Sequence, residues 1–169
     1  MKVLGIDPGT VVTGYGIIEE KDQNLFYICS GGIKTSSKKA FPDRLKKIYD
    51  NVVKIINEYC PDAIAIEELF FAKDVKAALK LGHASGVCLL ASANSGKPVI
   101  TYSSTQIKKA VIGYGRGEKH QVQRMVQTLL GLNSFPEPED AADALAVAIC
   151  HVHNNSFVRR LENTYDRYA

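Results

Sequence analysis

No apolar run in the sequence is long enough to cross a membrane, because glycine, serine or charged residues interrupt every one. The start of the chain also lacks the basic stretch and apolar core of a secretory signal, so we expect a cytoplasmic protein with no membrane partner. The cysteines are scattered without a Cys-x-x-Cys spacing, which favours free thiols in a reducing compartment over a disulfide frame or a zinc site. They are Cys29, Cys60, Cys88 and Cys150.

The sequence also lacks a strong net charge, since 21 Lys and Arg stand against 18 Asp and Glu. An excess of +3 is too small to indicate a nucleic-acid-binding protein by itself, but the basic residues are unevenly distributed. Lys73, Lys76 and Lys80 have the spacing of one helix face, which is equally typical of a solvated surface. A second group surrounds a Gly-rich loop and favours polyanion binding: Lys108, Lys109, Arg116, Lys119 and Arg124, with Glu118 opposing them.

The 169 residues, 46% of them hydrophobic, fit one globular domain, which we place at 1–153, followed by a flexible polar tail at 154–169. Three consecutive strands and then alternating helices and strands predict an α/β sheet with an antiparallel meander on one side. Ser104 or Thr105 is expected to cap the third helix. Strands are predicted at 3–7, 13–19, 24–34, 63–67 and 98–102, and helices at 45–59, 74–95, 106–112, 118–130 and from 140 onward.

Acidic residues stand in three segments that otherwise have the composition of a buried core. Asp7 ends the apolar run 3–6, and Glu67 ends the run 63–66. A buried carboxylate is costly unless a partner neutralises it, and no Lys or Arg lies within these segments. Strand alternation sends Glu67 and Glu68 to opposite faces, and we assign Glu67 to the site.

The third acidic segment opens the last helix, where Asp140 and Asp143 are three residues apart and therefore project from one face. Asp140 alone is also explained by the helix dipole, which favours acids in a first turn. Asp143 is harder to explain in that way, because its neighbours are apolar. Four acids from three distant segments suggest one shared site.

The electrostatic cost of such a site indicates what it is for. Two unit charges 4 Å apart repel by about 4 kcal/mol at an effective dielectric constant of about 20. Either some carboxylates are protonated, as in a carboxylate dyad, or divalent cations lie among them. Ligands that are all carboxylates favour Mg²⁺, with Mn²⁺ as a substitute. Two such ions about 3.5–4 Å apart suit phosphodiester hydrolysis.

Five motifs in order, covering about residues 1–153, closely resemble the RuvC family, the bacterial crossover junction endodeoxyribonucleases that resolve Holliday junctions. The Asp-Pro-Gly-Thr turn alone is weak, because sugar kinases and actin-like ATPases carry similar turns. Those proteins need a second domain and a second phosphate turn, which this sequence lacks. The motifs lie at 5–16, 65–70, 77–82, 118–123 and 140–146.

The resemblance implies an RNase H-like fold with a mixed five-stranded sheet flanked by helices, and a homodimer with two separated active sites. It implies that Asp7, Glu67, Asp140 and Asp143 are catalytic and bind two Mg²⁺ ions. It also implies that Lys108 and Lys119 contact DNA near the scissile phosphate, that Phe70 stacks on bases, and that a branch-migration motor is a partner. The candidate DNA contacts are Phe70, Lys73, Lys76, Lys80, Lys108, Arg116, Lys119 and Arg124.

The leading hypothesis is therefore a Mg²⁺-dependent, structure-selective endonuclease that cuts two symmetric strands of a four-way DNA junction in recombination and repair. Another RNase H-like nuclease acting on RNA, or a non-catalytic junction-binding module, is the alternative. The small-residue helix at 74–95 is either the dimer interface or is closely packed on its own sheet.

Overall fold

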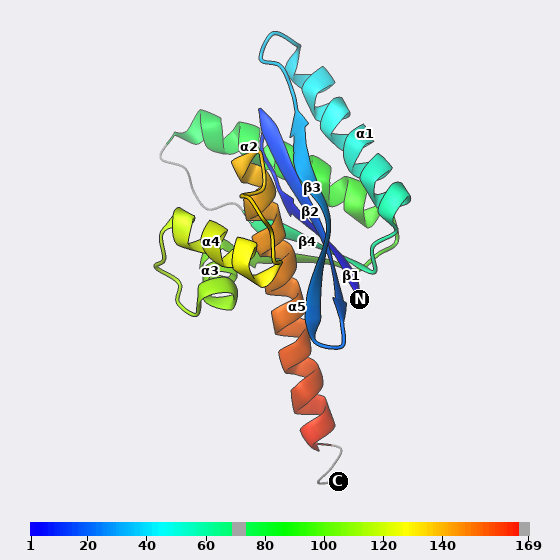
Figure 1. Ribbon diagram of the computed structural model, residues 1–169. Helices are drawn as coiled ribbons and strands as arrows, with labels where there is room; N and C mark the ends of the chain where they lie inside the picture. The colour runs from blue at the N-terminus through cyan, green and yellow to red at the C-terminus, as the bar shows by residue number, and fades with distance from the viewer. Residues whose placement is uncertain (69–73, 166–169) are drawn as a thin grey trace.

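The computed structural model describes residues 1–68 and 74–165, and for 156–165 it describes the backbone alone. Five strands form one sheet in the order β3-β2-β1-β4-β5 (Figure 1). The strands are β1 (Lys2–Asp7), β2 (Val12–Lys21), β3 (Asn24–Lys34), β4 (Ala63–Glu68) and β5 (Val99–Ser103). The helices are α1 (Phe41–Tyr59), α2 (Val75–Ala93), α3 (Ser104–Ile112), α4 (Lys119–Leu129) and α5 (Glu139–Tyr165).

The sheet is mixed, as the sequence predicts. Strands β1, β2 and β3 pair antiparallel as a meander, whereas β1, β4 and β5 pair in parallel. Parallel neighbours need a crossover, and here α1 connects β3 to β4 while α2 connects β4 to β5. The carboxyl ends of β1, β4 and β5 consequently meet at one edge of the sheet, where the functional site forms.

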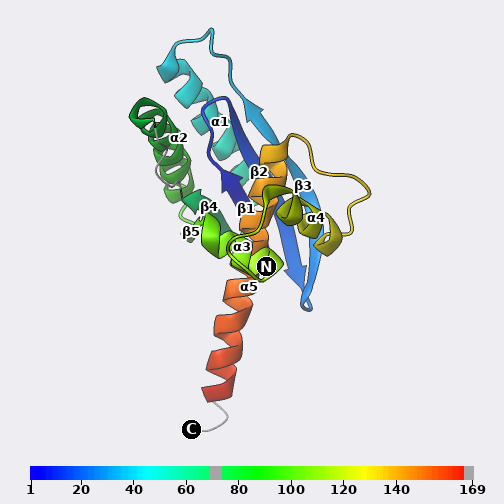
Figure 2. The same ribbon diagram turned by 90° about the vertical axis from the view of Figure 1, so that its left-hand side faces the viewer.

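Helices cover both faces of the sheet (Figures 1 and 2). Side chains alternate along each strand, so Leu4 and Ile6 belong to the core under α1 and α2, and Val3 belongs to the core under α3, α4 and α5. Asp7 is four residues after Val3 on β1, and Glu67 is two residues after Ala65 on β4, so each acid projects to the same side as that core residue. Val3 and Ala65 both belong to the core under α3, α4 and α5. Both acids therefore project on the side of the sheet that α5 covers.

Helix α5 lies directly on the sheet because glycine occupies the contact positions of the strands. A Cβ atom on Gly5 would be 2.0 Å from the carbonyl oxygen of Ala144, well inside van der Waals contact. Ala144, Leu145 and Ala148 are fully buried in this contact. The close approach fixes the height of α5 above β1, and with it the positions of the acids in the first turn of α5.

Two local expectations differ from the structure. The N-cap of α3 is Ser103, whose side chain accepts from the backbone N–H of Gln106 in a capping box. Ser104 is instead the first helical residue, and its hydroxyl is free for another partner. Helix α5 runs on to Tyr165, so the backbone of 154–165 is helical where the sequence suggested a loosely held tail. The division into a domain and a tail stays a prediction.

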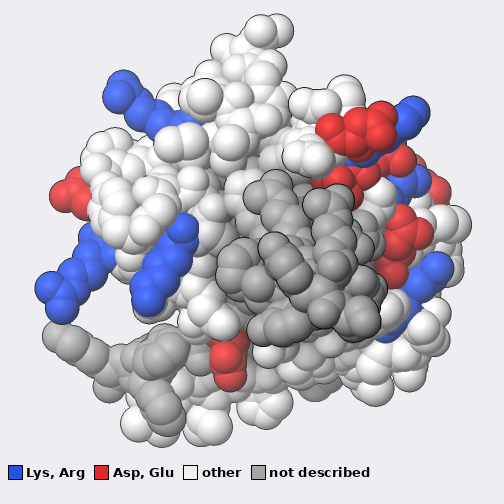
Figure 3. Space-filling view, turned by 90° about the horizontal axis from the view of Figure 1, so that it is seen from below, with Lys and Arg blue, Asp and Glu red and all other residues white. Residues whose placement is uncertain are grey.

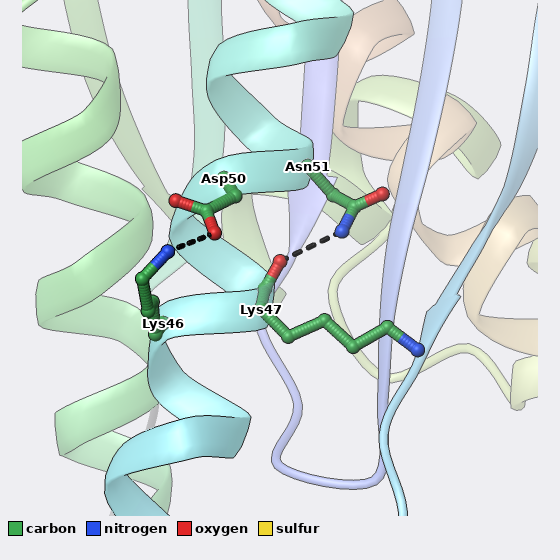
Figure 4. A network of polar contacts seen from close by, with 4 residues as sticks. All are labelled: Lys46, Lys47, Asp50 and Asn51. Atoms are coloured by element: carbon green, nitrogen blue, oxygen red, sulfur yellow. Dashed lines mark hydrogen bonds and ion pairs between the residues drawn. The ribbon is translucent and has the colours of Figure 1, made fainter.

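The outer surface of α1 carries exposed polar pairs, of which Lys46 with Asp50 is an i, i+4 ion pair of 2.6 Å (Figure 4). Asn51 donates to the Lys47 carbonyl one turn away, at 2.8 Å. Solvent screens such exposed pairs, so they contribute little to the stability of the fold. In the described part of the chain, no helix combines the length and the apolar character needed to cross a membrane.

Candidate active site

Asp7 and Glu67 lie side by side at the carboxyl ends of two adjacent strands. Ile6 and Ile66 are register partners in the parallel pair β1–β4, and each acid follows directly after its isoleucine. Neighbouring strands are about 4.8 Å apart, so the two carboxylates start from backbone positions at that spacing. Glu67 is half-buried and Glu68 is exposed. The structure thus places Glu67, and not Glu68, beside Asp7.

The first turn of α5 brings the other two acids to the same place. A Cβ atom on Gly14, the register partner of Asp7, would lie 3.0 Å from the Cβ of Asp140. The charges of Asp140 and Asp143 also raise the pKa of Asp7. Three distant segments of the chain therefore meet at one edge of the sheet. The roles of these four residues in metal binding and catalysis remain proposals.

The site holds more negative charge than its surroundings compensate. The pKa of Asp7 is raised to about 8, first by burial and then by the charges of Glu67, Asp143 and Asp140. Burial also raises the pKa of Glu67 and that of Asp143. A cluster of this kind favours either a bound proton or a bound cation near neutral pH.

A pocket of about 190 Å³ opens beside the acids, between α3, α4 and α5. Glu67 and Asp143 line it on the acidic side, and Lys108 and Lys119 on the basic side. Its remaining walls are Ser104 and the apolar side chains of Ile107, Val122 and Ala146. Lysines next to carboxylates suit a phosphodiester, because ammonium groups attract the phosphate while the acids recruit cations.

Lys119 is in direct contact with the acids. Its Nζ is 2.9 Å from Oδ2 of Asp143 and 3.2 Å from Oε2 of Glu139. The hydrogen bond to Asp143 is the main reason that the pKa of Lys119 is raised, so this ammonium stays protonated. Lys119 in turn opposes the rise in the pKa of Asp7, Glu67 and Asp143.

Ser104 is a site residue that the sequence analysis assigned to a different role. Its hydroxyl hydrogen-bonds to the Glu67 carboxylate and holds the pKa of that carboxyl lower than burial alone would set it. Glu67 and Tyr102 are register partners, so Ser104 follows β5 at the same edge of the sheet. The signal that would have identified it is its position just after a parallel strand next to β4.

The other predicted DNA contacts have mixed outcomes. Arg116 is exposed in the loop between α3 and α4, and Arg124 is exposed on α4, the helix that carries Lys119. Lys76 and Lys80 are exposed on α2 and line no part of the pocket. Phe70 and Lys73 lie outside the described residues. For all of them, DNA contact stays a prediction.

The face seen from below in Figure 1 differs from the site. Where its residues are drawn, basic and acidic side chains are interspersed without a large patch of one sign (Figure 3). A surface of mixed charge exerts little net attraction on a polyanion.

The residues present fit a hard divalent cation by their chemistry. The converging groups are carboxylates whose charge is uncompensated, and oxygen ligands of this type are those that Mg²⁺ and Mn²⁺ prefer. Within the described ranges, the four acids share one edge of the sheet, but no three acid, histidine or cysteine side chains lie at the mutual distances of a metal-binding group. The ammonium of Lys119 lies against Asp143 instead.

Comparisons with known proteins show the family to which the chain belongs. The family model for crossover junction endodeoxyribonuclease RuvC matches residues 3–151. A crossover junction endodeoxyribonuclease RuvC from Alkaliphilus oremlandii is 52% identical over 157 residues, covering 93% of this chain and 96% of the relative. The solved structure of Thermus thermophilus RuvC is 34% identical and superposes with a TM-score of 0.86, covering 93% of this chain and 96% of that one.

A second solved structure contains the Thermus thermophilus protein in complex with a Holliday junction substrate. It is 32% identical to this chain, with a TM-score of 0.85 and the same coverage of 93% and 96%. Fold and site together define a metal-dependent nuclease of the RNase H-like class. Within that class, the chain belongs to the RuvC family of crossover junction endodeoxyribonucleases.

Proposed function

We propose that this protein resolves Holliday junctions by Mg²⁺-dependent hydrolysis of one phosphodiester bond in each of two symmetric strands. The observation that carries the proposal is the convergence of Asp7, Glu67 and Asp143 beside Lys119 at one edge of the sheet. The Thermus thermophilus relative, which covers nearly the whole chain, forms a complex with a Holliday junction substrate.

Each group in the site has a part in this reaction. Asp7, Glu67, Asp140 and Asp143 would hold two Mg²⁺ ions, with Mn²⁺ as a substitute. When bound, such ions supply the positive charge that stabilises an in-line displacement at phosphorus. Lys108 and Lys119 attract the phosphate into the pocket, and Ser104 orients the Glu67 carboxylate. The apolar wall of Ile107, Val122 and Ala146 restricts the access of bulk water to that side.

We further propose that the protein acts as a homodimer built on α2. One face of this helix carries exposed apolar side chains, with Val75 at 70%, Leu79 at 60% and Leu90 at 55% exposure. Gly82 and Gly86 lie on the same face, and a Cβ atom on either would meet open space. Large exposed apolar faces mark interaction sites. A second copy is the occupant we favour, because a two-fold dimer matches a four-way junction with one active site per cut strand.

A cleavage assay on a synthetic four-way DNA junction tests the proposed function. In millimolar Mg²⁺ the wild-type protein should nick two strands of like polarity at symmetric positions. Asp7→Asn should bind the junction without cutting it. Cleavage at the wild-type rate by Asp7→Asn would contradict the proposal.

The same assay separates the alternatives. Preferential cutting of an RNA-containing duplex would favour an RNA-directed nuclease, and binding without cleavage would favour a non-catalytic junction-binding module. A linear DNA duplex is the control for structure selectivity. Cytoplasmic location and loading by a branch-migration motor stay predictions from the resemblance.

A further inference from the structure

The contacts of Lys119 point to a second role for this residue, distinct from attracting the phosphate. Its ammonium donates to an oxygen of Asp143 at 2.9 Å, and that carboxylate is itself largely shielded, with a side chain 22% exposed. An ion pair that is shielded on one side is screened less than a surface pair. Lys119 therefore neutralises one of the negative charges whose mutual repulsion destabilises the folded protein.

A divalent cation and the Lys119 ammonium compete for the same carboxylate. The ammonium uses Oδ2 of Asp143 as its acceptor, and a metal ion bound to this carboxylate would draw on the same negative charge. In addition, two positive centres at one carboxylate repel each other. The presence of one therefore weakens the binding of the other.

Glu139 offers Lys119 an alternative position. It lies four residues before Asp143 on α5, so both acids project from the same face of that helix. Lys119 Nζ already contacts Glu139 Oε2 at 3.2 Å, and the Glu139 side chain is 74% exposed. The ammonium can therefore leave Asp143 and keep an ionic partner toward solvent, where a substrate phosphate would approach.

We propose that Lys119 is an exchangeable counter-cation of the active site: it neutralises Asp143 until a divalent metal binds, and then turns outward to the substrate phosphate. This inference rests on the proposed function, because it presumes a metal at the acids. It predicts that Lys119 weakens metal binding in the absence of DNA. A lysine that only contacts phosphate would leave metal binding without DNA unchanged.

The experiment is a titration of the full-length protein with Mn²⁺ in the absence of DNA, followed by electron paramagnetic resonance and repeated with Mg²⁺ by calorimetry. Lys119→Met removes the charge and keeps most of the aliphatic length. We expect it to bind Mn²⁺ about tenfold more tightly than wild type, within the range of about 5–150-fold that is typical of coupled sites.

Lys108→Met is the matched control, because Lys108 lines the same pocket and affects the pKa of Glu67, but has no recorded ion pair within the described residues. It should tighten Mn²⁺ binding by less than about threefold, the effect of removing charge without removing contact. Lys119→Arg should retain the ion pair and bind as wild type does. Lys119→Gln, measured in parallel, guards against a folding defect specific to methionine.

Equal or weaker Mn²⁺ binding by Lys119→Met and Lys119→Gln would overturn the inference. So would equal tightening by Lys108→Met, because the effect would then be one of general charge. These outcomes are distinct from a failure of the proposed function, in which the wild-type protein would leave a four-way DNA junction uncut in millimolar Mg²⁺.

Discussion

A Cβ atom added to Gly14 would lie 2.0 Å from the carbonyl oxygen of Asp140. Gly14 is the register partner of Asp7 in the antiparallel pair β1–β2. The first turn of α5 is therefore pressed against the strand position directly opposite Asp7, and the absence of a side chain there sets the distance between two of the four acids.

We expect Gly14→Ala to separate α5 from the sheet at the site. The clash is with backbone, which cannot rotate away, so the free energy of unfolding should fall by at least about 1–3 kcal/mol. Cleavage of a four-way junction should fall by roughly 100-fold, because catalysis is sensitive to displacements of about 1 Å. Lys21→Ala, at the exposed end of the same strand, is the control and should change neither quantity. Normal cleavage by Gly14→Ala would show that the spacing is not critical.

The raised pKa of Asp7 predicts how stability depends on pH in the absence of divalent cations. Its pKa is about 8 in the folded protein against a reference value of 3.8. Between these values the folded state holds a proton that the unfolded state has lost, so the free energy of unfolding decreases as pH rises. The contribution of protonated Asp7 to the free energy of unfolding is fully present below about pH 4 and is lost by about pH 8.

At pH 8 in EDTA, the free energy of unfolding of Asp7→Asn should consequently exceed that of wild type by on the order of a few kcal/mol. The variant should therefore unfold at a higher temperature. The difference should disappear toward pH 4, and added Mg²⁺ should narrow it at pH 8 by stabilising the wild type. Thermal unfolding followed by circular dichroism measures both trends. An Asp7→Asn variant no more stable than wild type at pH 8 would mean that the acids are already neutralised.

Glu67 and Glu68 differ in position but not in chemistry, which makes them a matched pair. Glu67→Gln should reduce junction cleavage by roughly 10²–10³-fold, the loss typical of removing a group that stabilises a transition state. Glu68→Gln should cleave at nearly the wild-type rate, because Glu68 is exposed and faces away from α5. If Glu68→Gln lost cleavage and Glu67→Gln kept it, Glu68 would be the site residue.

Ser104 should act as a positioning residue for Glu67. Ser104→Ala removes a hydrogen bond to a carboxylate, worth about 1.5–3 kcal/mol for a charged acceptor, so cleavage should fall about tenfold or more. Because that bond lowers the pKa of Glu67, its loss should also move the acidic limb of the pH–rate profile to higher pH. Ser104→Thr keeps the hydroxyl and should restore the profile. An unshifted profile in Ser104→Ala would indicate a purely structural role.

If the exposed apolar face of α2 forms the dimer interface, a charge introduced on that face should break the dimer. Leu79→Glu places a carboxylate at the centre of the apolar face and should convert the dimer to a monomer in sedimentation experiments. Ala77→Glu adds the same charge to an exposed position on another side of the helix, and should leave the dimer intact. A wild-type protein that sediments as a monomer at high concentration would refute the homodimer.

Much of the fold could be predicted from local patterns. The five strands and five helices follow from period-2 and period-3.6 spacing, and the meander follows from three strands without an intervening helix. Two local details differ from these patterns: Ser103 rather than Ser104 caps α3, and the helical backbone of α5 continues beyond 154, while the division into a domain and a tail stays a prediction. Both adjacent serines are good caps, and only the path of β5 into the helix decides between them. A polar segment likewise becomes helical when it extends an established helix, because propagation is easier than nucleation.

The sequence by itself determined that acids stand at the ends of apolar segments, and alternation determined that Glu67 and Glu68 project to opposite faces. It could not determine that Lys119 lies 2.9 Å from Asp143, or that Ser104 bonds to Glu67. These contacts join residues from different elements, and their distances depend on how closely α5 approaches the sheet over Gly5 and Gly14. Periodicity fixes the face on which a side chain projects, whereas only tertiary packing fixes how far it lies from a side chain on another element.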